Sequence, residues 1–197
     1  IGVVVSVVHY LAESEKKKKK KTFGSYVIFV LDKVLAAYVS VMRGTPLAIQ
    51  LTIMAFIIMA GFPNKIVVCC VAFGINSGAY VAEIIRGGIM SIDNGQTEAG
   101  RSLGFSYPMT MLYIVIPQAL KNVLPSLANE FIVLLKETSV AGYVAVEELT
   151  KGGDIIRGTT YSAFMPLIAV ALIYLVMVVF FTKLVAILER RLRNSDH

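Results

Sequence analysis

The chain has 197 residues, of which 56% are hydrophobic and 16% charged, and its formal net charge is +6. Ordinary soluble domains have roughly 45–50% apolar and about 25% charged residues, so a soluble domain of this composition would lack charge for its exterior. The apolar residues also fall in long blocks separated by polar clusters, which is typical of chains that cross a bilayer several times. The composition therefore predicts an all-α integral membrane protein.

The first apolar block, residues 1–12, is followed by a run of six lysines at residues 16–21. Twelve helical residues cover about 18 Å, whereas a span needs about 30 Å. A cleaved signal peptide carries its positive charges before the apolar core, and here they follow it. We therefore expect this block to be the end of a first span that is truncated at the N-terminus.

Four further spans are expected along the chain. Residues 23–43 have apolar side chains at helical spacing but include Asp32 and Lys33, which predicts an interfacial helix leading into a span. The second to fifth spans are predicted at residues 46–62, 65–89, 123–146 and 162–188, with polar segments at 93–113 and 147–161 between them. The sequence thus predicts five membrane helices in one domain, residues 1–197.

Lysine and arginine set the expected orientation. Of the 19 Lys and Arg residues, 15 fall in residues 13–44, 86–121 and 183–197. Cytoplasmic loops are enriched in these residues, so we expect an external N-terminus and a cytoplasmic C-terminus. The lysine run is interpreted as a cytoplasmic loop. The sharper alternative is a specific site for acidic lipid or nucleic acid, which six lysines without aromatic residues support little.

A spaced pattern lies in the polar segment between the third and fourth spans. Glu98-Ala99-Gly100 is followed after three residues by Gly104, and after nine more by Ile114-Val115-Ile116-Pro117. Small residues allow a short helix to approach a partner closely, and a glycine supplies the turn between two short helices. Glu98 suits the start of a helix and leaves a carboxylate for a basic partner group. An ordinary polar connector would explain the polarity but not this spacing.

The spacing resembles the EAA loop of the permease subunits of ABC importers, with Gly100 in place of an alanine and Ile116 in place of a leucine. Other segments resemble the subgroup that imports polar amino acids: residues 43–47, 80–89, 95–99, 116–119 and 136–139. In the last of these, Glu137 and Val140 depart from the commoner form. The resemblance covers about residues 38–193.

The resemblance implies a permease subunit of an ATP-driven importer of a polar amino acid such as glutamine, glutamate, histidine or arginine, in a bacterial cytoplasmic membrane. The implied partners are a pair of ABC ATPase subunits that bind ATP and Mg²⁺, a second permease subunit, identical or paralogous, and an extracytoplasmic binding protein. Six residues are implied to couple the permease to the ATPase: Glu98, Ala99, Gly100, Leu103, Gly104 and Phe105.

Polar residues within the spans are costly in lipid and are candidates for the substrate path. Asn76, Ser77 and Tyr80 lie on the third span and could line this path, or could form hydrogen bonds between helices. Glu83 and Arg86, three residues apart on one helical face, form either an ion pair that holds the structure or a gate.

Lys136, Thr138 and Ser139 near the end of the fourth span offer groups for the carboxylate and ammonium of an amino acid. The alternative for Lys136 is that it extends to water at the outer edge of the membrane.

The chain has no G-x-x-x-x-G-K-[ST] loop for ATP, so it is predicted not to be an enzyme and to carry no cofactor. Its two cysteines, Cys69 and Cys70, are adjacent, and its only histidines are His9 and His197, which do not form a spaced metal site. The alternatives are an ABC permease for methionine or a metal ion, an ion-driven secondary transporter, for which internal repeats are expected but not seen, and a membrane scaffold, which would not need charged spans.

Overall fold

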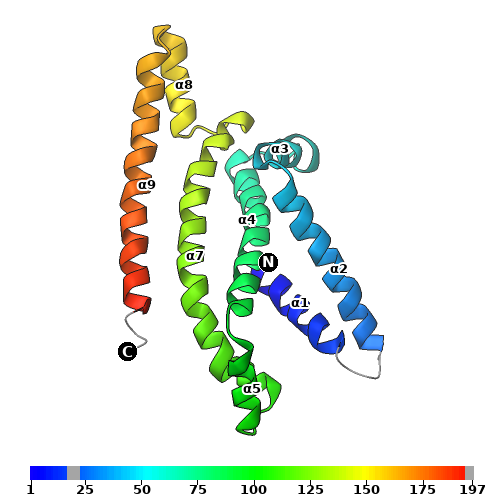
Figure 1. Cartoon of the computed structure of the whole chain (residues 1–197). Helices are drawn as coiled ribbons and strands as arrows, with labels where there is room; N and C mark the ends of the chain where they lie inside the picture. Colours follow the sequence, from blue (N-terminus) through cyan, green and yellow to red (C-terminus); the bar gives the residue numbers. More distant parts are fainter. Residues whose placement is uncertain (17–22, 194–197) are drawn as a thin grey trace.

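A computed structural model of the chain describes residues 1–16 and 23–193, and these residues are helical with no strand (Figure 1). The helices are α1 Gly2–Lys16, α2 Phe23–Gly44, α3 Leu47–Ile53, the π-helical η1 Met54–Ile58, α4 Lys65–Met90, α5 Asn94–Ser102, α6 Tyr107–Thr110, the π-helical η2 Met111–Val115, α7 Ile116–Glu137, the 3₁₀-helical η3 Thr138–Val144, α8 Leu149–Thr160 and α9 Phe164–Arg193. Most of the lysine run, and His197, lie outside the described residues.

Four helical segments of the described chain are long and apolar enough to cross a membrane: α2, α4, the continuous segment Tyr107–Val144 and α9. The third and fifth predicted spans match α4 and α9 within a few residues. The fourth begins at Tyr107 rather than near residue 123. Pro108 in the first turn is pre-organised for a helix, so the polar segment becomes helical earlier than its composition suggests.

Two predicted segments were assigned wrongly. Residues 23–43 form no interfacial helix but the continuous α2, whose 22 residues extend about 33 Å. Asp32, which suggested an interface, is buried and pairs with His9 of α1, so the helix need not leave the membrane to solvate it. Residues 46–62 do not form a span, because they contain only α3 and η1, twelve residues or about 18 Å.

α4 lies at the centre of the chain, in contact with α1, α2, α3 and α7 (Figure 1). Small residues make these contacts close. A Cβ at Gly2 of α1 would lie 2.6 Å from Val81, and one at Gly88 would overlap Val123 of α7. The Ser6 hydroxyl of α1 lies 3.0 Å from the Ala82 carbonyl oxygen of α4.

A compact apolar cluster joins α3, η1, α4 and η3 at one end of α4. Its buried members are Leu51, Ala55, Val68, Cys69, Ala72, Ala141 and Val144. Cys69 is therefore a packing residue, and Cys70 is exposed.

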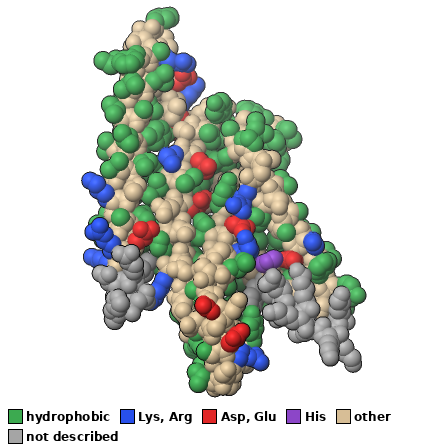
Figure 2. Space-filling view, viewed as in Figure 1, with side chains coloured by type: hydrophobic (Ala, Val, Ile, Leu, Met, Phe, Trp, Pro, Cys, Tyr) green, Lys and Arg blue, Asp and Glu red, His purple; other side chains and the backbone are tan. Residues whose placement is uncertain are grey.

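The ends of the bundle differ. Figure 1 shows α5 at one end, with the C-terminal end of α9 pointing the same way, and α3 and the α8–α9 turn at the opposite end. Figure 2 shows hydrophobic side chains along α9, with Lys and Arg side chains gathered toward its C-terminal end. The segment with the spaced glutamate and glycines thus lies at the end of the bundle toward which the basic end of α9 points.

Candidate functional site

The segment between α4 and α7 forms two short helices separated by a glycine. Asp93 caps the first, α5, by accepting a hydrogen bond from Gly95 N–H at 2.6 Å. Gly104 has φ +86°, in the left-handed region that favours glycine, and α6 begins three residues later. The predicted turn at Gly104 is therefore confirmed.

The residues implied in coupling divide into two sets. Glu98, Ala99, Leu103 and Phe105 are exposed, with 77% of Leu103 accessible. Gly100 is buried, and a Cβ there would lie 2.7 Å from Thr110 Cγ2 and 2.8 Å from Ile114 Cδ1. Gly100 therefore allows α5 to pack on its own chain, whereas the sequence suggested close approach to a partner.

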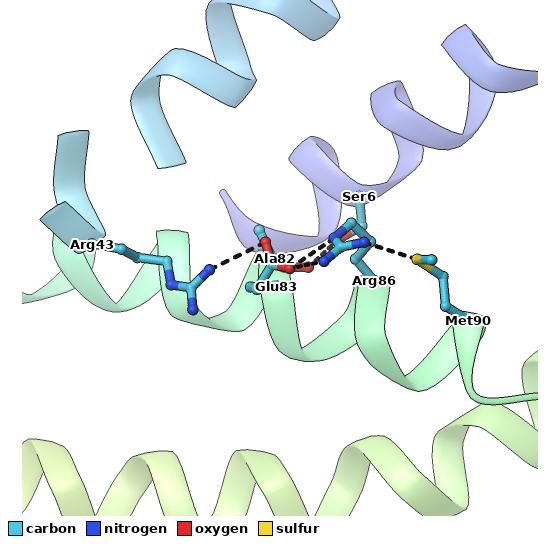
Figure 3. Close-up of polar contacts among 6 residues, drawn as sticks. All are labelled: Ser6, Arg43, Ala82, Glu83, Arg86 and Met90. Carbon is cyan, nitrogen blue, oxygen red and sulfur yellow. Dashed lines mark hydrogen bonds and ion pairs between the residues drawn. The ribbon is translucent and has the colours of Figure 1, made fainter. Parts of the chain in front are cut away.

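A three-residue charge network joins α2 to α4 (Figure 3). Glu83 accepts a hydrogen bond from Arg86 Nε at 2.8 Å and forms an ion pair with Arg43 Nη1 of α2 at 3.3 Å. The Arg43 guanidinium also lies over the Tyr80 ring, 5.6 Å from its centroid. The Glu83–Arg86 pair predicted from the sequence exists, and Arg43 extends it across two helices.

A cavity of about 300 Å³ lies between α1, α2 and α4 beside this network. Its polar lining residues are Ser6, His9, Asp32, Ser40, Arg43, Glu83 and Arg86. His9 Nδ1 and Asp32 Oδ1 are 2.6 Å apart. Sequence reasoning missed this pair, because nothing in the local pattern shows that residues 23 positions apart on different helices meet.

The polar residues of α4 have partners on three other helices. Asn76 is buried and donates hydrogen bonds to Gln50 Oε1 of α3 at 2.8 Å and to the Met42 carbonyl of α2 at 3.2 Å. Ser77 donates to Glu130 Oε1 of α7 at 3.4 Å. For Asn76, these contacts favour the alternative of hydrogen bonds between helices.

Lys136, Thr138 and Ser139 lie at the junction of α7 and η3, separate from the polar residues of α4. Lys136 is exposed, and the Thr138 hydroxyl donates to the Leu135 carbonyl at 2.8 Å. Ser139 lines a second cavity, of about 310 Å³, with Tyr143, Glu148, Lys151 and other residues of η3, α8 and α9. The structure therefore does not bring all the predicted path residues together.

Further polar residues continue along the same helix as Lys136. Asn122, Ser126 and Asn129 are all exposed, and their spacing of four and three residues places them on one side of α7. This polar side was missed, although its helical spacing is visible in the sequence. In the described ranges, no group of three or more His, Cys, Asp or Glu residues could hold a metal ion.

Long apolar helices with polar groups that find partners on neighbouring helices are the features of a multi-span membrane protein. The family model of the binding-protein-dependent transport system inner membrane component matches residues 23–194, and the chain belongs to this family.

Related proteins are similar over at least 80% of their own length. The arginine transport system permease protein ArtQ of Bacillus subtilis is 37% identical, over all of this chain and 86% of its own length. The glutamine transport system permease protein GlnP of Escherichia coli K12 is 35% identical, over 88% of this chain and 80% of its own length. A putative glutamine transport system permease protein GlnP of Rickettsia bellii is 34% identical, over 97% of this chain and 84% of its own length.

Two solved structures have the same fold. A crystal structure of an amino acid ABC transporter with histidines is 40% identical, with a TM-score of 0.79, covering 96% of this chain and 86% of that one. A structure of the MetNI methionine ABC transporter has a TM-score of 0.75 over 98% of this chain and 86% of its own, at 18% identity. The second likeness concerns the fold alone.

Proposed function

We propose that this chain is the permease subunit of an importer that moves a polar amino acid across a bacterial cytoplasmic membrane, powered by ATP hydrolysis on separate subunits. The observation that carries the proposal is its likeness to glutamine and arginine permeases over at least 80% of their lengths. The exposed helix α5 supports it, because it offers the ATPase a docking surface. ATP and Mg²⁺ belong to that partner.

The proposed membrane arrangement has five spans. α1 forms part of the first, followed by α2, α4, the segment Tyr107–Val144 and α9. The N-terminus is outside and the C-terminus and α5 are cytoplasmic. This orientation is supported by the basic end of α9, which points toward the α5 end of the bundle (Figures 1 and 2).

The orientation has a direct test by cysteine labelling, in a background with Cys70 replaced by serine. Tyr161, 96% exposed at the α8–α9 turn, and Leu103, 77% exposed beside α5, mark the two ends of the bundle. Tyr161→Cys should react with an impermeant maleimide in intact cells, and Leu103→Cys only after permeabilisation. The reverse pattern would overturn the orientation.

The polar side of α7 is proposed to border the substrate path. A lysine within a span is costly unless it reaches water or a partner. Lys136, together with Asn122, Ser126 and Asn129, is exposed in the single chain, and a water-filled path beside a second permease subunit would solvate all four. Lys136 then faces the carboxylate of a passing amino acid, with Thr138 and Ser139 nearby.

The proposed coupling depends on two connections of α4: the chain continues from α4 into α5, and an ion pair joins α4 to α2. When ATP binds, the ATPase pair closes and pushes on the exposed face of α5. This face is formed by Glu98, Ala99, Leu103 and Phe105. Since α5 follows α4 directly, this load reaches the end of α4. Glu83 bridges α2 and α4 through Arg43, so a change in the angle between these helices requires that ion pair to rearrange. The network is thereby proposed as a gate for alternating access.

The test is ATP hydrolysis by the assembled complex. The chain is purified with its co-encoded ATPase, and hydrolysis is measured with the binding protein and, in turn, each of the twenty amino acids, methionine included, and divalent metal ions. We expect stimulation by one or a few polar amino acids. Stimulation only by methionine or by a metal ion would support the other ABC permease classes, and an assembled complex that no solute stimulates would contradict the proposal.

A further inference from the structure

The π-helical turn η2 lies between the coupling segment and α7. In it, Ile116 N–H donates to the Met111 carbonyl, five residues back. Pro117 follows directly, and proline has no N–H and crowds the carbonyl four residues before it, here that of Tyr113. The wider π turn accommodates this proline. Such turns are rare and occur frequently at functional sites.

α5 is seated on η2 by two contacts. The buried Gly100 leaves room for Thr110 Cγ2 and Ile114 Cδ1, and Thr110 itself is fully buried. On the same side, the Gln118 amide Nε2 donates both to Gln96 Oε1 of α5, at 3.2 Å, and to the Ile114 carbonyl, at 3.0 Å. The close packing of Gly100 and the hydrogen bonds of the Gln118 amide therefore hold α5 against the π turn.

A second row of buried residues lies about 100° around the axis of the same helix. Met111 and Val115 of η2 are buried, and the row continues with the buried Ala119 and Val123 of α7. Val123 packs on Gly88 of α4, where a Cβ would overlap it. α5 and α4 thus contact two different sides of one helix, so the rotation of this helix at η2 decides how the two are aligned.

We propose that η2 sets the rotational register of α5 on α7, so that a load on the exposed face of α5 is passed to the α4–α7 pair. Thr110, Ile114 and Gln118 are the positioning residues of this relay. This inference rests on the proposed function. The competing account is that η2 only accommodates Pro117 and that the direct connection of α5 to α4 is the sole route of coupling.

The first experiment disturbs the packing of Gly100 of α5 on Thr110 and Ile114 and then restores it. Gly100→Ala places a Cβ against Thr110 and Ile114, whereas adding Thr110→Ser and Ile114→Val removes the two methyl groups that it would meet. Complexes with the ATPase and the binding protein are reconstituted in liposomes, and ATP hydrolysed per amino acid imported is measured. We expect this ratio to rise about threefold or more in Gly100→Ala and to return toward the parental ratio in the triple variant.

The ratio separates positioning from stability. A variant that is only less stable gives less complex but hydrolyses the same number of ATP molecules per amino acid. Equal ratios in the parental, single and triple variants would overturn the inference. If the parental complex itself shows no ATP-dependent import, the proposed function fails, which is a different result.

The second experiment removes the π turn itself. Deletion of Tyr113, which is 66% exposed, removes the extra residue of this turn, so the helix closes as a regular α-helical turn and Thr110 and Ile114 lose the spacing on which Gly100 is packed. Tyr113→Ala is the control, because it removes the side chain and keeps the π turn. We expect import to be lost in the deletion while the control stays near the parental rate. Import at the parental rate by the deletion would contradict the relay, and where the deletion prevents assembly, the Gly100 variants decide.

Discussion

α4 and α9 are both long and apolar enough to cross a membrane, but they are built for different surroundings. Of the most apolar 18-residue stretch of each helix, 39% is buried within the chain in α4 and 6% in α9. α4 carries Asn76, Ser77, Glu83 and Arg86, each with a partner on its own or another helix. The first nineteen residues of α9 have no charged side chain. Polar groups within the bilayer thus occur where neighbouring helices supply partners, and α9 supplies surface for lipid.

The largest effect is expected at the turn after α5. Gly104→Leu places a branched side chain at φ +86°, which costs about 1–2 kcal/mol and favours a different turn. Import should fall at least tenfold, with ATP hydrolysis continuing in the assembled complex. Gly104→Asn should lose less, because asparagine tolerates the left-handed region.

Gly158→Leu, near the end of α8, is the matched control for Gly104→Leu, because it makes the same substitution at the opposite end of the bundle. A Cβ at Gly158 meets nothing within 4 Å, so import should be unchanged. Equal losses in Gly104→Leu and Gly158→Leu would mean that α5 has no special role.

The next effect concerns the charge network of α4. Glu83→Gln leaves Arg43 and Arg86 without their shared carboxylate, which should destabilise the complex by about 1–3 kcal/mol, between the values for exposed and buried pairs. Thermal unfolding and import of the purified complex are measured. The double variant Arg43→Gln/Glu83→Gln should recover part of the loss. Additive losses in the double variant would show that the two residues do not interact.

Charges outside α4 sharpen the comparison further. Lys136 of α7 and Lys183 of α9 are both exposed in the single chain, but only Lys136 is assigned to the substrate path. Lys136→Met should lower import or change the amino-acid preference, with basal ATP hydrolysis retained, whereas Lys183→Met should leave uptake by liposomes unchanged. Parental affinity and rate for every polar amino acid in Lys136→Met would exclude Lys136 from the path.

A smaller effect is expected from neighbouring glycines of α4. Gly88→Ala adds a methyl group that overlaps Val123 of α7, and over-packing of this kind costs typically about 1–3 kcal/mol. Gly87→Ala adds the same group into open space and should be neutral or stabilising by up to about 1 kcal/mol. Thermal unfolding in detergent measures both, and indistinguishable stabilities would contradict close packing of α4 on α7.

The smallest effect is expected on α9. Val176 is 68% exposed and contributes apolar surface, so Val176→Leu should change stability by less than about 0.5 kcal/mol. Unfolding midpoints of this variant and the parental chain are compared. A large destabilisation would show that another protein surface, rather than lipid, covers this side of α9.

The sequence predicts the apolar helix α9 well, and it predicts less well the elements whose polar groups or close packing depend on distant residues. α9 was predicted within a few residues, because an uninterrupted apolar run bounded by charges has only one interpretation. α2 was assigned wrongly because Asp32 looked unfavourable in a span, and its partner His9 is distant in sequence. The turn at Gly104 was predicted from local spacing, whereas the packing of Gly100 on Thr110 needed the tertiary structure.

The central claim is that this chain conducts a polar amino acid inward at the expense of ATP. Its most direct measurement is uptake of radiolabelled glutamine, glutamate, histidine and arginine by liposomes that contain the permease, its ATPase and the binding protein, with no ion gradient. We predict uptake of at least one of these amino acids that requires ATP at the ATPase and is lost in Gly104→Leu. Uptake that proceeds without ATP when a sodium or proton gradient is applied would contradict the account.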